Sequence, residues 1–443
     1  METIRETQQA IKLLLMFSLL LCLLYSSTVF AACSGLPVES TTGKWTAYDA
    51  SYDCVSEAVS KANPGDTVII PTGSETWAST LTISKSIILT GSGNLGTTIN
   101  GSGETLINVD LPADVVLRIH NIHFKWSTNN PGGRSIHISG KTNNSFAYTK
   151  IRIDNNKFEK GSRALQSNGW VYGLIDNNTF VNCNIAVGIT GDNNHAWGRS
   201  IGAGTADALF IEDNTLIINN DADRGPNEQI YHQEGSRTVI RYNAFEGEDY
   251  TDGAYLAFDS HGNQSYYDGT GDFRGQPLIE FYSNTIDIDS TYRHFNFRSG
   301  SLLIYDNDIT QTKSTSPNKF YLQDEEAWQT QFFSTLRTEW PAQDQVNNSF
   351  FWNNTFNGSP ITSANVPSNS LDFIEEDRDY FMHAPQAAGG KSTYTGRAGA
   401  DMTFSSSGPN AYYPYTPYEY PHPLTKDSED PVNPVNTGIK IKI

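Results

Sequence analysis

The stretch LIDNNTF at positions 174–180 decides the fold, because close variants of it recur along the chain. Each variant has the form Φ-x-x-N-x-Φ, in which Φ is an apolar residue. The other copies are RIDNNKF (152–158), FIEDNTL (210–216), IRYNAF (240–245), FYSNTI (281–286), IYDNDI (304–309) and FWNNTF (351–356). Self-similarity of this kind is the signature of a solenoid, in which stacked repeats bury a core that no single repeat can bury alone.

The last apolar residue of each copy gives the length of the repeat. These residues are Phe158, Phe180, Leu216, Phe245, Ile286, Ile309 and Phe356, at separations between 22 and 47 residues. The shortest separations set the unit, and the longer ones contain insertions or a skipped coil. Short strands that end at glycine, such as SIHISG (135–140) and LAFDSHG (256–262), precede the motifs. The pattern predicts short strands joined by Gly and Asn turns. The motif asparagines should stack as a ladder: Asn156, Asn178, Asn214, Asn243, Asn284, Asn307 and Asn354.

These repeats resemble the right-handed parallel β-helix of the pectin-lyase-like superfamily. The segment DCVSEAVSKANPGDTVIIP (53–71) strengthens the resemblance, since many such proteins begin with a short amphipathic helix that caps the open core. Here Cys54, Val55, Ala58, Val59 and Ala62 would form its apolar face. The resemblance covers roughly residues 45–360 and implies an all-β, single-stranded parallel β-helix with an N-terminal capping helix. It implies the fold only, because this superfold hosts lyases, hydrolases, epimerases and adhesins.

The chain divides into five predicted parts. Residues 1–31 form a signal peptide, since an apolar run at 13–25 is followed by small residues, so no transmembrane span is expected in the mature chain. Residues 32–64 form the N-terminal cap, 65–360 the β-helix, 361–425 an irregular C-terminal cap and 426–443 a linker-like tail. The Pro- and Tyr-rich stretch AYYPYTPYEYPHPL (411–424) could lie extended along the body.

The cysteines are consistent with secretion. Cys33 and Cys54 could pair in an oxidising compartment, whereas Cys183 fits a buried, inert core position. In the alternative, Ala31-Ala32-Cys33 resembles part of a bacterial lipobox, so lipid anchoring at Cys33 at the cell surface stays open.

A formal net charge of −19 over 443 residues argues against a nucleic-acid partner, because phosphate binding needs a basic surface. We expect a monomer whose partner is an extracellular polysaccharide. No cofactor is required, although Asp221, Asp223 and Glu228 could bind Ca²⁺; an acidic surface loop is the commoner explanation for these residues.

Side-chain alternation along aligned strands predicts one outward polar patch. If the coils are aligned on Gly140, Gly169, Gly235 and Gly262, then Tyr231 and Phe258 point inward. In the following coil, matching Phe297 to Phe258 puts Arg298 beside Asp259. The patch predicted from these alignments contains His232, Glu234, Asp259, His261 and Arg298. Insertions around it hold Tyr250, Tyr255, Tyr266, Tyr267 and Trp197, on which sugars could stack, and Arg241 and Arg293 could bind an acidic polymer.

Two classes of function fit this patch. The first is a secreted polysaccharide lyase or glycoside hydrolase. In a lyase, His232 or His261 would take a proton and Arg298 would offset a uronate carboxylate; in a hydrolase, Glu234 and Asp259 would share the acid and base roles. The second is a non-catalytic carbohydrate-binding or adhesive β-helix. Convergence of the five residues in one walled cleft would favour the enzyme.

Overall fold

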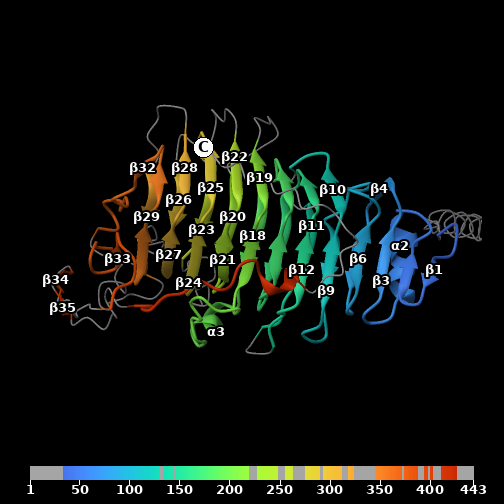
Figure 1. Cartoon of the computed structure of the whole chain (residues 1–443), viewed down its shortest axis with the longest axis horizontal. Helices are drawn as coiled ribbons and strands as arrows, with labels where there is room; N and C mark the ends of the chain where they lie inside the picture. Colours follow the sequence, from blue (N-terminus) through green and yellow to red (C-terminus); the bar gives the residue numbers. More distant parts are fainter. Residues whose placement is uncertain are drawn as a thin grey trace, which may run out of the picture.

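The structure is a computed structural model that describes residues 33–129, 133–142, 146–218, 227–247, 255–262, 275–289, 293–311, 318–323, 345–371, 374–387, 394–397, 400–402 and 411–426. Its strands stack along one axis into an elongated solenoid (Figure 1). Successive strands enter three different sheets in turn, and equivalent strands of neighbouring coils pair in parallel. This is the predicted right-handed parallel β-helix.

The first sheet forms the side that carries the C-terminal segment. Its strands, in spatial order, are β1 (Val38–Thr41), β2 (Lys44–Thr46), β3 (Thr67–Ile70), β6 (Ile88–Gly91), β9 (Leu117–His120), β12 (Ile151–Asp154), β15 (Leu174–Asp176), β18 (Leu209–Glu212), β21 (Arg237–Arg241), β24 (Leu278–Tyr282), β27 (Ser301–Tyr305), β30 (Ser349–Trp352) and β33 (Tyr380–Phe381). Only β1 and β2 run antiparallel among these described strands.

The second sheet contains the ends of the repeat motifs. Its strands are β4 (Gly73–Trp77), β7 (Thr97–Gly101), β10 (Ile122–Trp126), β13 (Lys157–Glu159), β16 (Thr179–Val181), β19 (Thr215–Ile218), β22 (Ala244–Gly247), β25 (Thr285–Ile288), β28 (Asp308–Thr310), β31 (Thr355–Phe356) and β32 (Ser359–Pro360). The predicted anchors, from Phe158 to Phe356, pair in register from coil to coil. They point into the core, where Phe124, Phe158 and Phe180 stack with ring centroids 5.2 and 5.0 Å apart.

The third sheet contains the strands that precede each motif. They are β5 (Leu81–Ile83), β8 (Thr105–Val109), β11 (Arg134–Ser139), β14 (Arg163–Asn168), β17 (Ile185–Thr190), β20 (Asn227–Gln233), β23 (Tyr255–Ser260), β26 (Arg293–Phe297) and β29 (Asn318–Leu322). Between β17 and β18 the chain forms the short helix α3 (Asn193–Trp197). Outside the solenoid, β34 (Tyr394–Arg397) and β35 (Ala400–Met402) form a separate antiparallel pair.

The predicted asparagine ladder joins the first and second sheets at their shared corner. The side-chain oxygen of Asn178 accepts hydrogen bonds from the backbone and side-chain nitrogens of Asn156, and the same pattern continues through Asn354. Each ladder side chain also donates to backbone carbonyls, as Asn178 does to Ile153 and Asp176. The ladder therefore satisfies polar groups that the tight corner would otherwise leave buried and unbonded. The left-handed backbone lies one residue earlier, for example at Asn177 (φ 53°).

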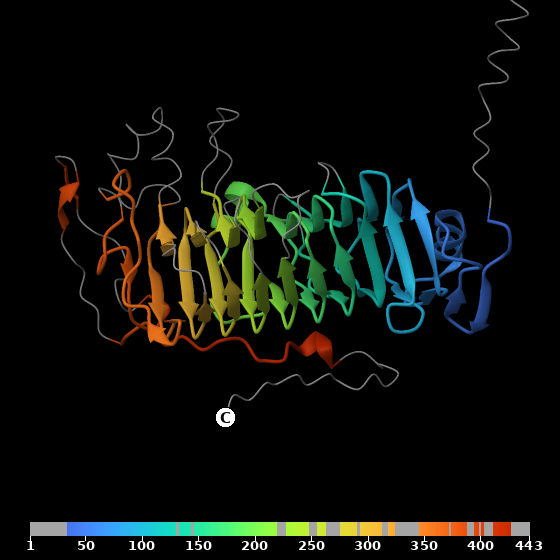
Figure 2. The same ribbon diagram turned by 90° about the horizontal axis from the view of Figure 1, so that it is seen from above.

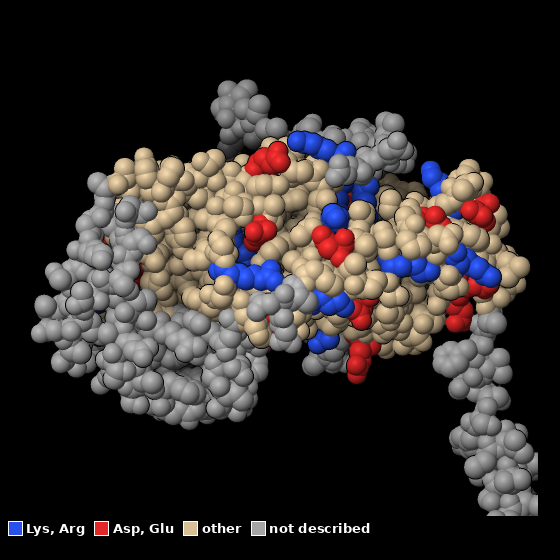
Figure 3. Space-filling view, turned by 90° about the horizontal axis from the view of Figure 1, so that it is seen from below, with Lys and Arg blue, Asp and Glu red and all other residues tan. Residues whose placement is uncertain are grey.

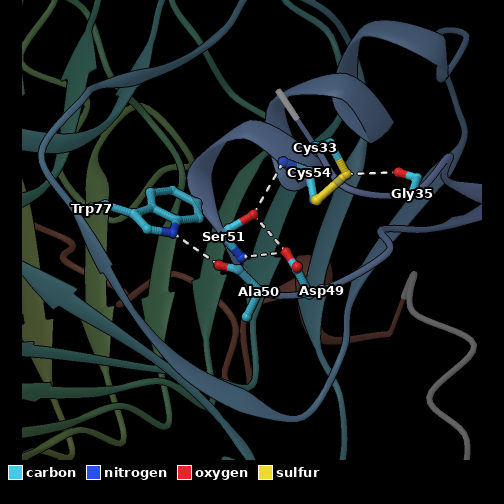
Figure 4. The surroundings of a disulfide bond; sticks show 7 residues. All are labelled: Cys33, Gly35, Asp49, Ala50, Ser51, Cys54 and Trp77. Atoms are coloured by element: carbon cyan, nitrogen blue, oxygen red, sulfur yellow. Dashed lines mark hydrogen bonds between the residues drawn. A yellow bond between two sulfur atoms is a disulfide. The ribbon is translucent and has the colours of Figure 1, made fainter. Parts of the chain in front are cut away.

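The N-terminal cap is a helix joined by a disulfide to Cys33, the first residue that the structure describes (Figure 4). Helix α2 (Tyr52–Lys61) begins at Ser51, whose side chain accepts from the backbone nitrogen of Cys54. Cys33 and Cys54 form a disulfide, which confirms that pairing. A sulfur in a disulfide cannot also carry a lipid, so the pairing and the anchor at Cys33 exclude each other. Cys183 is buried in the core, as predicted.

Residues 411–426, here called the C-terminal strap, run extended along the outer face of the first sheet (Figure 2). Their last described turn is the 3₁₀ helix η4 (Pro423–Thr425). Arg241 lies beneath the strap and donates to the backbone carbonyls of Tyr418 and Glu419. The backbone nitrogen of His422 donates to Glu212 at 2.9 Å. The prediction that this segment lies along the body is confirmed.

Candidate functional site

The strand register of the third sheet determines which side chains face outward. Ile136, Leu165, Val187, Ile230, Phe258 and Phe295 pair in sequence and point into the core. The residue after each therefore faces out: His137, Gln166, Gly188, Tyr231, Asp259 and Asn296. This register differs from the one obtained by aligning glycines.

The glycine alignment is wrong by one residue at β20. The turn after β20 has two left-handed residues, Glu234 (φ 57°) and Gly235 (φ 76°), so the turn holds one residue more than in the preceding coils. Ile230 rather than Tyr231 is then the inward residue. Phe258 likewise pairs with Phe295, not with Phe297, so Arg298 follows the end of β26 beside His261.

His232 consequently lies inside the solenoid and not in the outward patch. Its side chain is fully buried, hydrogen-bonds with Ser236 and Thr238, and packs on the ring of Phe258. Burial lowers the pKa of His232 to about 3, against the opposing charge of Asp259. Glu234 occupies the turn. The predicted outward orientation of His232 is therefore wrong, whereas the pairing of Glu234 with Asp259 as acid and base stays a prediction.

Asp259, His261 and Arg298 do come together. Asp259 faces outward from β23, yet neighbouring side chains cover it completely. Its Oδ2 accepts from Nη2 of Arg298 at 2.6 Å and lies 3.3 Å from Nε2 of His261. Nη1 of Arg298 lies 3.0 Å from Nδ1 of His261. Because guanidinium can only donate, Nδ1 accepts, and the imidazole proton is on Nε2, facing the carboxylate.

Tyr231 and Gln233 extend this cluster onto β20. The ring of Tyr231 packs on that of His261 with centroids 4.8 Å apart. Its hydroxyl donates to Gln233, which in turn donates to Thr190 on β17. The glycine alignment predicted Tyr231 to point inside; strict alternation counted from Ile230 along NEQIYHQ would have predicted it to point outside.

Glu228 is a further acidic group near the cluster. Burial raises its pKa, and the charge of Asp259 raises it further, while His261 and Arg298 act in the opposite direction. Glu228 was predicted only as a Ca²⁺ ligand together with Asp221 and Asp223, and these two residues lie outside the described residues. Within the described ranges, no three His, Cys, Asp or Glu side chains are grouped to hold a metal ion.

The predicted substrate-binding residues separate into three groups. Arg241 belongs to another face: it is fully buried under the C-terminal strap, ion-paired with Glu212 at 2.7 Å, so its prediction as a sugar-binding residue is wrong. Arg293 does lie on the third sheet, over the ring of Tyr321. Trp197 donates to the carbonyl of Gly275, next to β24. Tyr250, Tyr266, Tyr267 and the side chain of Tyr255 lie outside the described residues.

The burial of Asp259 limits what it can do. A carboxylate that is fully covered and engaged by two cationic or donor groups orients those groups but cannot reach a glycosidic bond. Arg298 and His261 are only partly covered, with side-chain exposures of 17% and 15%. The exposed chemistry of the site is therefore a fixed guanidinium, an oriented imidazole and a neighbouring phenol.

The surface charges are mixed. On the face in Figure 3, Lys and Arg alternate with Asp and Glu among the coloured residues, without a continuous basic stretch. No helix in the described part of the chain is long and apolar enough to cross a bilayer.

Comparison with known proteins supplies no residue roles. No protein-family model matches the chain, and neither does any curated protein. Among solved structures, an alginate lyase from Paenibacillus sp. is 12% identical, with a TM-score of 0.37 and coverage of 64% of this chain and 97% of its own. A rice weevil pectin methyl esterase is 13% identical, with a TM-score of 0.37 and coverage of 74% and 92%. A family 28 exopolygalacturonase from Yersinia enterocolitica is 12% identical, with a TM-score of 0.31 and coverage of 72% and 75%.

Proposed function

We propose that this protein is a secreted polysaccharide lyase that cleaves a uronate-containing polymer by β-elimination on the outer face of the third sheet. The observation that carries the proposal is the arrangement of Asp259, Arg298 and His261 beside Tyr231. A uronate carboxylate acidifies the proton on the neighbouring C5 carbon when a cation offsets its charge. Arg298 offers such a cation, held in place by a buried carboxylate.

Substrate binding would itself make His261 available as the general base. In the structure, Nη1 of Arg298 donates to Nδ1 of His261 and Nη2 donates to Asp259. A substrate carboxylate that takes the Nη1 hydrogen bond leaves the Nδ1 lone pair available, while Asp259 continues to hold the Nε2 proton. An imidazole oriented in this way by a carboxylate is an effective general base.

The reaction balances with these groups alone. His261 Nδ1 takes the C5 proton, the C4–C5 double bond forms and the bond between C4 and the glycosidic oxygen breaks. Tyr231, whose ring packs on the imidazole, donates its hydroxyl proton to the departing oxygen. The products are a 4,5-unsaturated uronate and a new reducing end. Tyr231 recovers its proton from His261 or water.

Glu228 favours a second candidate, a glycoside hydrolase. A carboxyl group whose pKa is raised by burial and by a neighbouring Asp can serve as the general acid of a glycosidase. Such an enzyme would need a second catalytic carboxylate other than Asp259, which is fully covered. Hydrolysis is therefore the weaker proposal.

A turnover screen on plant, algal and bacterial polysaccharides separates these possibilities. Ultraviolet absorbance follows the unsaturated uronate, and a reducing-end assay follows any chain cleavage. Both signals should rise with wild-type protein and vanish in His261→Gln and Arg298→Ala. His123→Gln, on the outer face of the second sheet and hydrogen-bonded to Glu159, is the matched control and should retain both. Reducing ends alone, lost in Glu228→Gln, would establish the hydrolase instead. Silence in both assays with glycan retention intact would leave a binding solenoid.

A further inference from the structure

Two arginines lie side by side on the third sheet, on strands β11 and β14. Arg134 and Arg163 pair directly in the strand register, and both side chains are half-buried. Throughout the ranges that the structure describes, neither forms an ion pair with a carboxylate. The side chain of Arg163 is instead held by a hydrogen bond of 2.6 Å from Nη1 to Gln166. Two guanidinium groups, both always charged, thus share one part of the surface.

Arg163 reaches toward the reacting centre across a strand that lacks a side chain at this point. The outward position of β17 is Gly188, where a Cβ atom would lie 2.6 Å from the Gln166 side chain and 3.7 Å from Cδ of Arg163. The guanidinium of Arg163 lies 5.8 Å from the ring centre of Tyr231. Tyr231 therefore contacts Arg163 on one side and His261 on the other.

The electrostatics of the pair favour an anion. Burial lowers the pKa of Arg163, and the adjacent charge of Arg134 lowers it further, whereas Tyr231 and Glu228 act in the opposite direction. Holding two like charges in partly dry surroundings is unfavourable unless an anion offsets them. Arginine pairs also match the planar, two-oxygen geometry of a carboxylate or sulfate.

We infer that Arg134 and Arg163 form a subsite for an acidic sugar, bearing a carboxylate or a sulfate, that begins beside Tyr231 at Arg163 and extends away from Arg298 to Arg134. This inference rests on the proposed function for the path of the chain. Coils are spaced by about 4.8 Å, so β11 and β26 are separated by roughly 24 Å. A polymer lying along the axis would contact the arginine pair and Arg298 at once, and a short oligosaccharide would not.

Binding measured without turnover tests the subsite independently of catalysis. The double variant Arg134→Gln/Arg163→Gln is compared with Lys44→Ala/Lys61→Ala, which removes two positive charges from exposed positions in the N-terminal cap. Affinity gels containing a polyuronate, a sulfated galactan or a neutral glucan supply the three probes. We expect the arginine variant to bind one acidic polymer at least about tenfold more weakly, and the lysine control to match wild type. The polymer affected identifies carboxylate or sulfate as the ligand group.

Turnover by oligosaccharide length gives the second readout. The single variant Arg134→Gln, which leaves the contact between Arg163 and Tyr231 in place, should raise KM for long acidic oligomers and leave kcat unchanged, with short oligomers cleaved as by wild type. Unchanged retention on both acidic polymers, in a variant with unaltered thermal unfolding, would overturn the subsite. If retention falls but no substrate is ever cleaved, the proposed lyase activity fails and the subsite stands. Arg163→Lys separates folding from recognition, since it keeps the charge and should restore part of the retention.

Discussion

The carboxylate of Asp259 and the guanidinium of Arg298 are joined by a hydrogen bond of 2.6 Å, with the carboxylate fully buried and the guanidinium partly exposed. This asymmetry fixes the direction in which Arg298 presents its remaining donors. It also assigns the two residues different tasks, since only Arg298 can meet a substrate. Asp259 is a positioning residue for both Arg298 and His261.

Replacing Asp259 with Asn tests that assignment. The amide keeps the shape but removes the charge that orients Arg298 and the Nε2 proton of His261. We expect kcat to fall by roughly 10²-fold or more, with a smaller change in KM. Steady-state kinetics on the polymer found in the turnover screen would measure both. Equal losses in kcat and in folded protein, judged by thermal unfolding, would instead make Asp259 a purely structural residue.

Substituting Gly188 with Val tests the open position on β17. A β-branched residue suits a strand, but its side chain would displace Gln166 and turn Arg163 away from Tyr231. We expect weaker retention on the acidic polymer with little change in thermal stability. Retention equal to wild type would show that Arg163 does not need this path to bind its ligand.

The asparagine ladder predicts very different effects on stability for substitutions at two adjacent positions. Asn178→Ala removes a buried side chain that bonds Asn156, Ile153 and Asp176, and should lower the free energy of unfolding by about 3 kcal/mol or more. Asn177→Gly should be nearly neutral, because Asn177 is exposed and its φ of 53° suits glycine. Denaturant unfolding of the two variants measures the contrast, and similar losses in both would contradict the ladder's role.

Arg241→Gln should detach the C-terminal strap without impairing the site. Arg241 loses its buried ion pair with Glu212 and its bonds to the strap carbonyls, a change that costs about 3–5 kcal/mol in comparable buried pairs. Limited proteolysis should then cleave within residues 411–426 at protease concentrations that leave wild type intact. The KM for polymer should stay unchanged; a large rise would return Arg241 to the binding surface.

Acidification should destabilise the protein through His422. Burial lowers the pKa of His422 to about 4 from 6.5, and its Nδ1 accepts from the backbone of Leu424. Between these values the unfolded chain binds a proton that the folded chain does not, so stability is lost as the pH falls below about 6.5. His232 and His294, with pKa values of about 3 and about 4, act in the same direction.

The measurement is the unfolding free energy of wild type and His422→Gln between about pH 7 and pH 5. A histidine with a pKa of 6.5 in the unfolded chain and about 4 in the folded protein contributes at most about 1.4 kcal/mol per pH unit, and about 2 kcal/mol in total across this window. The variant should therefore lose about 2 kcal/mol less than wild type between the two pH values. Parallel declines would mean that His422 is protonated in the folded protein at the same pH as in the unfolded chain.

The repeated positions were predicted correctly, and the errors arose at single coils. The ladder and the anchors from Phe158 to Phe356 pair as predicted. Every coil buries the same positions, so the several copies of the motif all indicate the same alignment. The predicted orientations of Tyr231 and His232, inward and outward, are the reverse of those in the structure. One extra left-handed residue at Glu234 shifts the register, and a shift of one residue moves each side chain of a strand to the opposite face of the sheet. Arg241 was misplaced because its partners, Tyr418 and Glu419, lie far away in the sequence.

The strap also changes how the solenoid can come apart. In a simple stack, each coil touches only its neighbours, so an end can fray one layer at a time. Here a single segment bonds to β18 through Glu212, to β21 through Arg241 and to β24 through Glu280, while Tyr415 packs against Trp352 of β30. The strap therefore links several successive coils directly to one another. A force applied to the C-terminal end would act on several coils at once. Mechanical unfolding should therefore occur in one large step, and not in a series of small steps.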